Sequence, residues 1–378
     1  MNYDFSEKEF TLFVDIHEKI SELAEARPLD QRDAAQVKEN ISHTLGVLAQ
    51  TPYLKLGIQP VDDYQGQLSL MGAMEVVAAV SPSAYLSVEA STRLFGRAIN
   101  EWGDDDQKAK RLGPLLEGKL IGALAISEET LNIENDPLTT KGTRNGDSLS
   151  INGEKQYVIN APVADWIAVA GFCDEACAIF LVNKENSGLT IDPPLETLGY
   201  EGAAISGIRL DNCVIAADQV LFPPPKTNMP ATIRMWENQI ILGASLGLSK
   251  TAFETARDHA KSHRSGGKPI IAYQEVGFKL AEMLTLLQTS QLLAYRTAWT
   301  AETTPKEADE LTLCAKVFCA ESAEQICSDA LKIMGGAGYI AGNKAERAYR
   351  CAKYTQIAGT STEIARVKIG DAALGYRR

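Results

Sequence analysis

The sequence predicts an α+β protein made of a helical block, a block of β-strands and a second helical block. Apolar residues recur at helical spacing up to about residue 118. From about residue 121 they form short runs separated by turn residues, and from residue 233 onward they return to long helical periods. We therefore expect an amino-terminal helical domain over residues 1–120, a middle β-domain over 121–228 and a carboxy-terminal helical domain over 229–378.

The first block contains two well-marked helices. Phe10 and Phe13 begin a helical pattern near the amino terminus. Residues 84–102 form a second, largely apolar helical stretch that Gly103 closes. Acidic residues at 104–106 mark the next helix start, because carboxylates stabilise the positive end of the helix dipole.

The middle block has the pattern of a β-sandwich or barrel. Its apolar runs, such as residues 166–170 and 178–182, are short and roughly ten residues apart, with turn residues between them. Cys173 and Cys177 fall between these two runs. Their spacing allows a redox pair or half of a metal site, but a hairpin turn explains it more simply. Three prolines at 223–225 end the block as a stiff linker.

The last block consists of long helices. Thr304-Pro305 and Gly335-Gly336 break the helical pattern. The predicted helices cover residues 240–263, 274–300, 311–334 and 361–374.

Composition and charge exclude several classes of function. The net charge of -12 lacks the basic footprint of a nucleic-acid-binding protein and disfavours docking on an anionic membrane. No run of about 18 apolar residues is present, so we expect no membrane span. The acidic, polar amino terminus is unlike a secretory signal. The 7 cysteines lack paired metal spacing, which indicates reduced thiols, a cytoplasmic protein and no metal site.

Three motifs lie close together near the end of the chain. They are a Gly-Gly-x-Gly-Tyr turn at 335–339, a Glu-Arg followed by Arg350, and a Gly-Thr-Ser at 359–361 that leads into a helix. At these spacings they resemble the carboxy-terminal signature of the acyl-CoA dehydrogenase family. The resemblance implies an amino-terminal helical domain, a middle β-domain and a carboxy-terminal four-helix bundle, usually assembled as a homotetramer, with FAD as cofactor.

The resemblance assigns two segments of the middle block to the flavin ring. Ile126 and Ser127 end a strand that, in the family, presents backbone groups and a hydroxyl to the flavin. Tyr157 and Ile159 lie in the segment 152–160, where the family places an aromatic residue against the flavin and a threonine on its reactive nitrogen. The aromatic face is retained at Tyr157. At Ile159 only backbone amides remain for that hydrogen bond.

Further residues are implied to contact the rest of the FAD. Arg264, Ser265 and Gln274 stand in the segment that grips the pyrophosphate and adenine of a neighbouring subunit's FAD. An arginine can fork onto phosphate oxygens, and a Gly-Gly turn lets phosphate or ribose approach the backbone closely. The other implied cofactor residues are Lys332, Gly335, Gly336, Thr360, Ser361 and Thr362.

The glutamate that serves as catalytic base in many family members is missing from its usual place. That place is occupied by Gly359 when the sequences are aligned without a gap, and by Ala358 when one gap is allowed. The family reaction removes a proton α to a thioester, which needs a carboxylate in a water-poor slot, and a hydride from the β-carbon, which the flavin accepts. Neither Ala358 nor Gly359 can take a proton.

A second family solution places the base on the first long helix after the β-domain. Isovaleryl-CoA and long-chain dehydrogenases carry it in a Glu-Arg ten residues before a glycine, and Glu237 lies at that distance from Gly247. A glutamate here can also be a solvated residue of the first helical turn, but a small residue at 359 leaves room for a base from this helix. We expect Glu237 to be the base. The expected substrate contacts are Asn132, which stands in place of a glycine-rich family loop, Asn238, which replaces the arginine, Ala358 and Gly359.

The acyl group is less well determined. The helix of residues 84–100 should line the acyl pocket by resemblance, and Ser83 stands where members acting on dicarboxylic substrates place an arginine. Glu89, Arg93 and Arg97 on this helix are expected to face solvent. If one of them faced the pocket, the acyl group would be polar or short.

These observations favour an FAD-dependent acyl-CoA dehydrogenase with Glu237 as base and an electron-transfer flavoprotein as acceptor. One alternative is altered chemistry on the same scaffold, as in enoyl-CoA reductases, desulfinases and other lyases. The other is a non-catalytic subunit of a heteromeric dimer of dimers. Departures from the family pattern keep this second alternative open, at Ile159, His263, Gly266 and Lys332.

Overall fold

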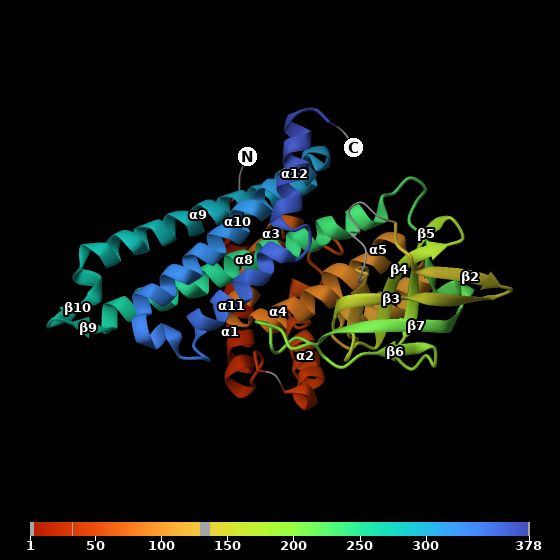
Figure 1. The fold of residues 1–378 in the computed structure, drawn as a ribbon, viewed down its shortest axis with the longest axis horizontal. Coiled ribbons are helices and arrows are strands. Elements are labelled where there is room, and N and C mark those ends of the chain that lie inside the picture. Colours follow the sequence, from red (N-terminus) through yellow and green to blue (C-terminus); the bar gives the residue numbers. More distant parts are fainter. Residues whose placement is uncertain (1–3, 32, 129–136, 377–378) are drawn as a thin grey trace.

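The sheet lies at one end of the molecule and the long helices of the last block extend to the other end (Figure 1). The computed structural model describes residues 4–31, 33–128 and 137–376. Helices, strands and helices follow one another along the chain in the predicted order. Asn132, a predicted substrate contact, lies outside the described residues.

The first block is helical and begins with a well-capped helix, α1 (Glu7–Ala26). The Ser6 hydroxyl accepts a hydrogen bond from the backbone N–H of Glu9, and the Glu9 carboxylate accepts one from Ser6. Asp104 and Gln107 form a second capping box, as the acidic run predicted. The other helices are α2 (Ala34–Leu48), α3 (Gly66–Val80), α4 (Pro82–Glu89), α5 (Arg97–Trp102), α6 (Asp105–Gln107) and α7 (Gly113–Leu116), with the 3-10 turn η1 (Pro52–Leu54) and the π-helical segments η2 (Ala90–Gly96) and η3 (Lys108–Leu112).

The middle block forms an eight-stranded sheet. Its strands are β1 (Gly122–Ala125), β2 (Lys141–Asn145), β3 (Ser148–Ile159), β4 (Trp166–Cys173), β5 (Ala176–Asn183), β6 (Leu189–Ile191), β7 (Ile205–Ala216) and β8 (Val220–Leu221), with the 3-10 turn η4 (Ala217–Gln219). They follow the order β6-β7-β3-β2-β4-β5-β8, and β1 pairs with β4 in parallel. β2 joins two halves of the sheet, because it pairs along its whole length with β3 but only through Lys141 and Gly142 with β4. Cys173 pairs with Ala176 across the β4–β5 turn, which confirms the predicted hairpin.

The first helix of the last block, α8 (Met229–Ser262), begins earlier than the predicted helix of residues 240–263. Pro230 occupies its first turn and the Asn228 side chain accepts a hydrogen bond from the backbone N–H of Ala231. Glu237 therefore lies more than two turns inside the helix. The alternative that it is a solvated residue of the first helical turn was wrong. The other elements are the hairpin β9 (Arg264–Ser265) and β10 (Lys268–Pro269), η5 (Ile270–Ala272), α9 (Gln274–Thr303), α10 (Pro305–Met334), η6 (Gly335–Tyr339), α11 (Lys344–Ile357) and α12 (Thr362–Ala373).

α8 approaches α3 very closely at Gly247. A Cβ atom on Gly247 would lie 2.5 Å from the Cβ of Ala78 and 2.6 Å from the backbone nitrogen of Ala79. Only glycine permits this approach. The helix that carries Glu237 is thereby held at a fixed distance from the first block.

Two large apolar cores meet at α8, beside a smaller one that includes its residues Leu242 and Leu246. One is continuous from the first block through the sheet and includes Phe95, Phe180 and Trp236. The other fills the last block, with Leu287 of α9 and Ile326 of α10 among its members. Because α8 contributes to both cores, side chains near its amino-terminal end lie at the junction of the three blocks.

A buried ion pair fixes the end of β1 to β3. The Lys155 Nζ lies 2.7 Å from the Glu128 Oε1, and the two side chains are 0% and 4% exposed. Hydroxyls and backbone amides of Thr139 and Thr140 donate to the same carboxylate, and Lys155 also donates to the Ile126 carbonyl at 3.1 Å. These contacts hold Ile126 and Glu128, the residues on either side of Ser127.

The ion pair keeps the Glu128 carboxyl charged. Burial alone would raise its pKa, but Lys155 and the donors of Thr139 lower the pKa from 4.5 to about 2. A carboxyl whose pKa is depressed by folding stabilises the protein above its unfolded pKa. This contribution is therefore complete above pH 4.5 and is lost as the pH falls towards 2.

No helix among residues 4–31, 33–128 and 137–376 combines the length and the apolar composition that a membrane span needs. In the same ranges, no three His, Cys, Asp or Glu side chains gather as metal ligands would.

Replacing Glu128 with glutamine should destabilise the fold, because it leaves the Lys155 ammonium buried without a countercharge. We expect Glu128→Gln to lower the free energy of unfolding by about 3–5 kcal/mol at neutral pH. The difference from wild type should shrink as the pH falls from 4.5 towards 2, where the wild-type carboxyl takes up a proton. Urea unfolding over this pH range measures both effects.

Glu117→Gln is the matched control. Glu117 pairs with Lys119 at a site where the side chains are 62% and 72% exposed, and such pairs contribute little in water. The control should leave the free energy of unfolding nearly unchanged. Equal losses in the two variants would contradict the role assigned to the buried pair.

Candidate functional site

A cavity of about 560 Å³ opens at the junction of the three blocks. The ends of β1 and β3, the loop 195–200, the amino-terminal part of α8 and the end of α11 surround it. Its wall is mainly apolar, and its polar lining includes Ser127, Tyr157, Arg234, Glu237, Arg350 and Tyr354. An apolar cleft with a few convergent polar groups is the usual form of a small-molecule site.

The predicted flavin-ring residues come together on one wall of this cavity. Ile126, Ser127, Tyr157 and Ile159 all line it. Tyr157 has a φ of 58°, and the β3–β7 register shifts between Lys155 and Val158. This irregularity turns the Tyr157 side chain out of the sheet core, so that it is 69% exposed.

Glu237 lines the same cavity as Ala358 and Gly359. The structure thus brings the candidate base to the place where the usual glutamate is missing. The Glu237 side chain is 19% exposed. Burial raises the pKa of the neighbouring Tyr354 hydroxyl, and the negative charge of Glu237 adds to this effect. A carboxylate in such a partly buried, mainly apolar cavity is a candidate general base.

Arg234 is a site residue that the sequence analysis missed. Its Nη1 lies 2.5 Å from the Glu237 Oε2, and its Nη2 donates to the Ser127 Oγ at 3.2 Å. The spacing of three residues on one helix is the signal that could have identified this pair.

Asn238 does not line the cavity. It holds the turn at residues 358–360, where the family usually places its glutamate. Its Nδ2 donates to the Thr360 Oγ1 at 3.1 Å, and its Oδ1 accepts from the Thr360 backbone N–H at 2.9 Å. Lys316 of α10 supports the turn from the other side by donating to the Gln356 carbonyl at 3.0 Å. Gly359 has a φ of 65°, and a Cβ there would lie 2.5 Å from the Asn238 Oδ1. A side chain at 359 would therefore be strained and would collide with Asn238.

Two polar residues of the predicted acyl-pocket helix are buried, so the expectation that they face solvent was wrong. Glu89 and Arg93 are 0% and 2% exposed. Arg93 donates to the backbone carbonyls of Tyr53 and Leu54, and the Tyr53 hydroxyl donates to Glu89 at 2.7 Å. These hydrogen bonds, together with the ion pair between Glu89 and Arg93, engage both charges away from the cavity.

The same helix presents an apolar face to the cavity. Leu86, Ala90 and Leu94 line a narrow inner extension that Glu237 also borders. Arg97 turns elsewhere and donates to Gln239 at 2.9 Å. The described lining of the inner extension therefore offers no cationic side chain to an acyl group.

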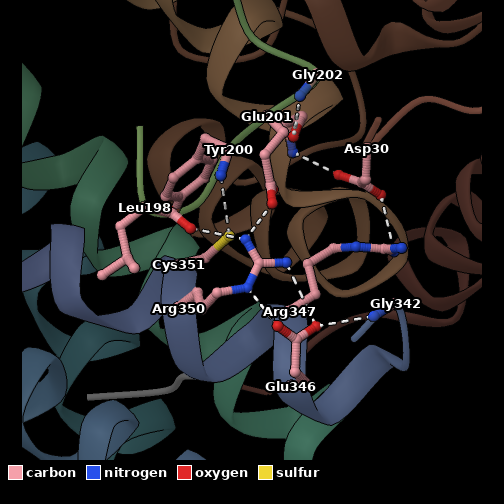
Figure 2. Close-up of polar contacts among 11 residues, drawn as sticks. Asp30, Leu198, Tyr200, Glu201, Gly202, Gly342, Glu346, Arg347, Arg350 and Cys351 are labelled. Carbon is pink, nitrogen blue, oxygen red and sulfur yellow. Dashed lines mark hydrogen bonds and ion pairs between the residues drawn. The ribbon is translucent and has the colours of Figure 1, made fainter. Parts of the chain in front are cut away.

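Arginines of α11 hold the loop that closes one side of the cavity (Figure 2). Arg350 forms ion pairs with Glu201 and Glu346 and donates to the Leu198 carbonyl at 2.7 Å. The loop 195–200 is thereby fixed against the helix. Arg347, the arginine of the Glu-Arg motif, has a related role.

Arg347 ties α11 to the first block. Its Nη1 lies 3.3 Å from the Asp30 Oδ2 (Figure 2), and the Asp30 Oδ1 accepts from the Ser83 backbone N–H at 2.9 Å. Burial raises the pKa of Asp30 even though the charge of Arg347 opposes it. The Glu-Arg and Arg350 motif of the sequence thus supports the walls of the cavity.

Other predicted cofactor residues lie at the far end of the helical block. Arg264 and Ser265 form β9, beyond the carboxy-terminal end of α8, and Gln274 begins α9 (Figure 1). From Arg234 to Ser262 the helix covers 28 residues (262 − 234), which at 1.5 Å per residue is about 42 Å. One chain therefore does not bring these residues to the cavity described above.

The remaining predicted cofactor residues lie at the end of α10, in η6, and at or just before the start of α12. Lys332 lies 2.9 Å from Asp329, which Lys279 of α9 also contacts at 3.4 Å. Gly335 and Gly336 follow directly in η6. Thr360 and Thr362 are buried, and the Ser361 hydroxyl caps α12 by accepting from the Ile364 N–H; none of the three is among the residues lining the described cavity.

The middle and last parts of the chain match the models of one protein family. Residues 123–213 match the acyl-CoA dehydrogenase middle domain, and residues 235–374 match the acyl-CoA dehydrogenase C-terminal domain. The 3-(aryl)acrylate reductase of Clostridium sporogenes is 29% identical over 374 residues, which cover 94% of this chain and 98% of that protein. The mitochondrial short-chain specific acyl-CoA dehydrogenase of Homo sapiens is 30% identical over 351 residues, covering 91% of this chain and 84% of that protein.

Solved structures share the fold over the whole chain. Butyryl-CoA dehydrogenase from Megasphaera elsdenii superimposes with a TM-score of 0.89 at 23% identity, covering 99% of this chain and 100% of that structure. This likeness confirms the predicted fold. From the family models and the relatives, we conclude that the chain belongs to the acyl-CoA dehydrogenase family, whose members are flavoenzymes acting on CH–CH bonds.

Proposed function

We propose that this protein is an FAD-dependent acyl-CoA dehydrogenase in which Glu237 removes the α-proton of an acyl-CoA thioester. The observation that carries the proposal is the position of the Glu237 carboxylate in one cavity with Gly359, Ser127 and Tyr157. A carboxylate, a glycine where the family usually places its base, and the wall expected to face the flavin all converge there.

The environment of Glu237 suits proton abstraction. Its side chain is 19% exposed, and Ile126 and Ile159 contribute apolar surface to the surrounding wall. Excluding water strengthens the attraction between the carboxylate and the proton that it removes. The proton moves from the α-carbon to Glu237, and the β-carbon loses a hydride. A bound flavin would supply the oxidant for that hydride.

The residues on the cavity wall fit a flavin ring. Tyr157 offers an exposed aromatic face, and Ser127 offers a hydroxyl just beyond the end of β1. Arg264, Ser265 and Gln274 lie beyond the far end of α8, away from this wall. We therefore assign these three residues to the FAD of a neighbouring copy in a homotetramer.

The proposed physiological setting follows from the same reaction. Electrons taken from the acyl chain must leave the flavin, and an electron-transfer flavoprotein is the proposed acceptor. The free thiols of all 7 cysteines support a cytoplasmic location.

The reverse reaction is the second candidate function. The relative named 3-(aryl)acrylate reductase matches nearly the whole chain. In that direction Glu237 would deliver its proton to the α-carbon while the β-carbon receives the hydride. A non-catalytic role in a heteromer remains the alternative that the next experiment tests.

Purified protein should show the absorbance of oxidised flavin. Anaerobic addition of acyl-CoA thioesters of increasing chain length should bleach it, because hydride transfer reduces the flavin. Reoxidation of chemically reduced protein by enoyl-CoA, without bleaching by any acyl-CoA, would favour the reductase. A colourless protein that takes up no added FAD would contradict both candidates and support the non-catalytic subunit.

Glu237→Gln should slow bleaching by about 100- to 10,000-fold, because the amide cannot take the proton. The variant should bind flavin as wild type does, since Glu237 is assigned to the substrate rather than to the cofactor. Stopped-flow absorbance measures the rate. Glu254→Gln, on the same helix but outside the cavity, is the matched control and should bleach normally. Wild-type rates in Glu237→Gln would overturn the base assignment.

A glutamate restored at 359 should not rescue the Glu237→Gln variant. Gly359 has a φ of 65°, and its Cβ position lies 2.5 Å from the Asn238 Oδ1, so Gly359→Glu should also destabilise the fold by more than about 1 kcal/mol. Ala358→Glu is the control, because Ala358 has a φ of -73° and lines the same cavity. Thermal unfolding and bleaching of both variants test this, and full activity of the Gly359→Glu, Glu237→Gln double variant would show that the vacated position can still hold a base.

A further inference from the structure

Arg234 contacts both the proposed base and the end of β1. Its Nη1 lies 2.5 Å from the Glu237 Oε2, and its Nη2 donates to the Ser127 Oγ at 3.2 Å. The Arg234 and Glu237 side chains are 14% and 19% exposed, so salt screens their attraction less than at the surface. The guanidinium is always charged and presents its donors in a rigid fork, so one residue can hold two partners in a fixed geometry.

The contact with Arg234 leaves one oxygen of the carboxylate available. Arg234 engages the Glu237 Oε2, and no described residue donates to the Oε1. A general base needs a free oxygen held within reach of the proton. Bases in enzymes are commonly oriented by a third group that binds the atom not used in proton transfer. Arg234 stands in that relation to Glu237.

Ser127 gives Arg234 a firm point of attachment. Its neighbour Glu128 is held by Lys155 at 2.7 Å, and Lys155 also binds the Ile126 carbonyl at 3.1 Å. The Ser127 carbonyl accepts a hydrogen bond from the Gln156 backbone N–H at 2.9 Å. Through one guanidinium, the orientation of Glu237 thereby depends on a wall segment that the buried ion pair holds in place.

Arg234 differs from the other two cationic side chains of the cavity wall in the partner that its charge faces. Arg350 is held by Glu346, and Lys353 lies 2.8 Å from Glu324. Arg234 instead directs its charge at the candidate base.

We propose that Arg234 is a positioning residue that holds the Glu237 Oε2 and turns the Oε1 towards the substrate. This inference rests on the proposed role of Glu237 as base. It assigns no new chemical step to Arg234, because a guanidinium does not exchange protons at physiological pH. Its effect is on the geometry of proton abstraction.

Arg234→Met tests the inference, because methionine keeps the apolar stem and removes both contacts. We expect the rate of anaerobic flavin bleaching at saturating acyl-CoA to fall about 100-fold, as for a misplaced catalytic group, with little change in KM and with wild-type flavin content. Arg234→Lys should recover part of the rate. Guanidinium added to Arg234→Ala should also restore part of it, which a merely structural loss would not allow.

Arg257→Met is the matched control. Arg257 lies on the same helix and pairs with the exposed Asp258 at 2.8 Å, outside the cavity. Its removal should leave bleaching unchanged, and it should not respond to guanidinium. This control distinguishes the general effect of removing an arginine from α8 from the specific effect of removing Arg234.

Two results would overturn the inference. One is a wild-type bleaching rate in Arg234→Met, and the other is a rise in KM alone, which would make Arg234 a substrate-binding residue. Failure of the proposed function is distinguishable from both. If Glu237→Gln is active, the base assignment itself fails, whereas an inactive Glu237→Gln beside an active Arg234→Met removes only the positioning role.

Discussion

The buried ion pair between Glu128 and Lys155 is the contact on which the arrangement of the cavity depends. It joins the end of β1 to β3, and these strands carry Ser127 and Tyr157 on the cavity wall. Burying two charges is unfavourable unless each is fully satisfied. The threonine donors and the Ile126 carbonyl meet that condition here. A strand end that would otherwise fray is therefore rigid where the site needs it.

The second wall of the cavity depends on α8. Gly247 lets this helix contact α3 backbone to backbone, and Asn238 binds the turn at Thr360. Glu237 directly precedes Asn238 on this helix. The Asn238 side chain occupies the space next to Gly359 that a longer residue would need. The glycine at 359 and the asparagine at 238 therefore fit each other, and this packing favours a base on α8.

Charged side chains near the cavity divide into two groups by what satisfies them. Glu89 and Arg93 are neutralised by each other and by Tyr53, on the side of their helix that faces away from the cavity. The inner extension is left with apolar walls. Arg234 and Glu237 satisfy each other inside the cavity, where a substrate can compete for the same atoms. This difference in placement separates structural charges from candidate catalytic ones.

The amino-acid sequence by itself determined the order of the blocks, the family and the candidate base, because helical and strand periods and the spacing from Glu237 to Gly247 are local properties of the chain. Only the tertiary structure decided which polar residues reach the cavity. Glu89 and Arg93 were expected in solvent but are buried, since a helix covered on all sides gives no periodic signal of its surroundings. Arg234 was missed because its partner Ser127 is 107 residues away in the chain. Contacts between distant segments arise from packing, and packing is where the site acquires its geometry.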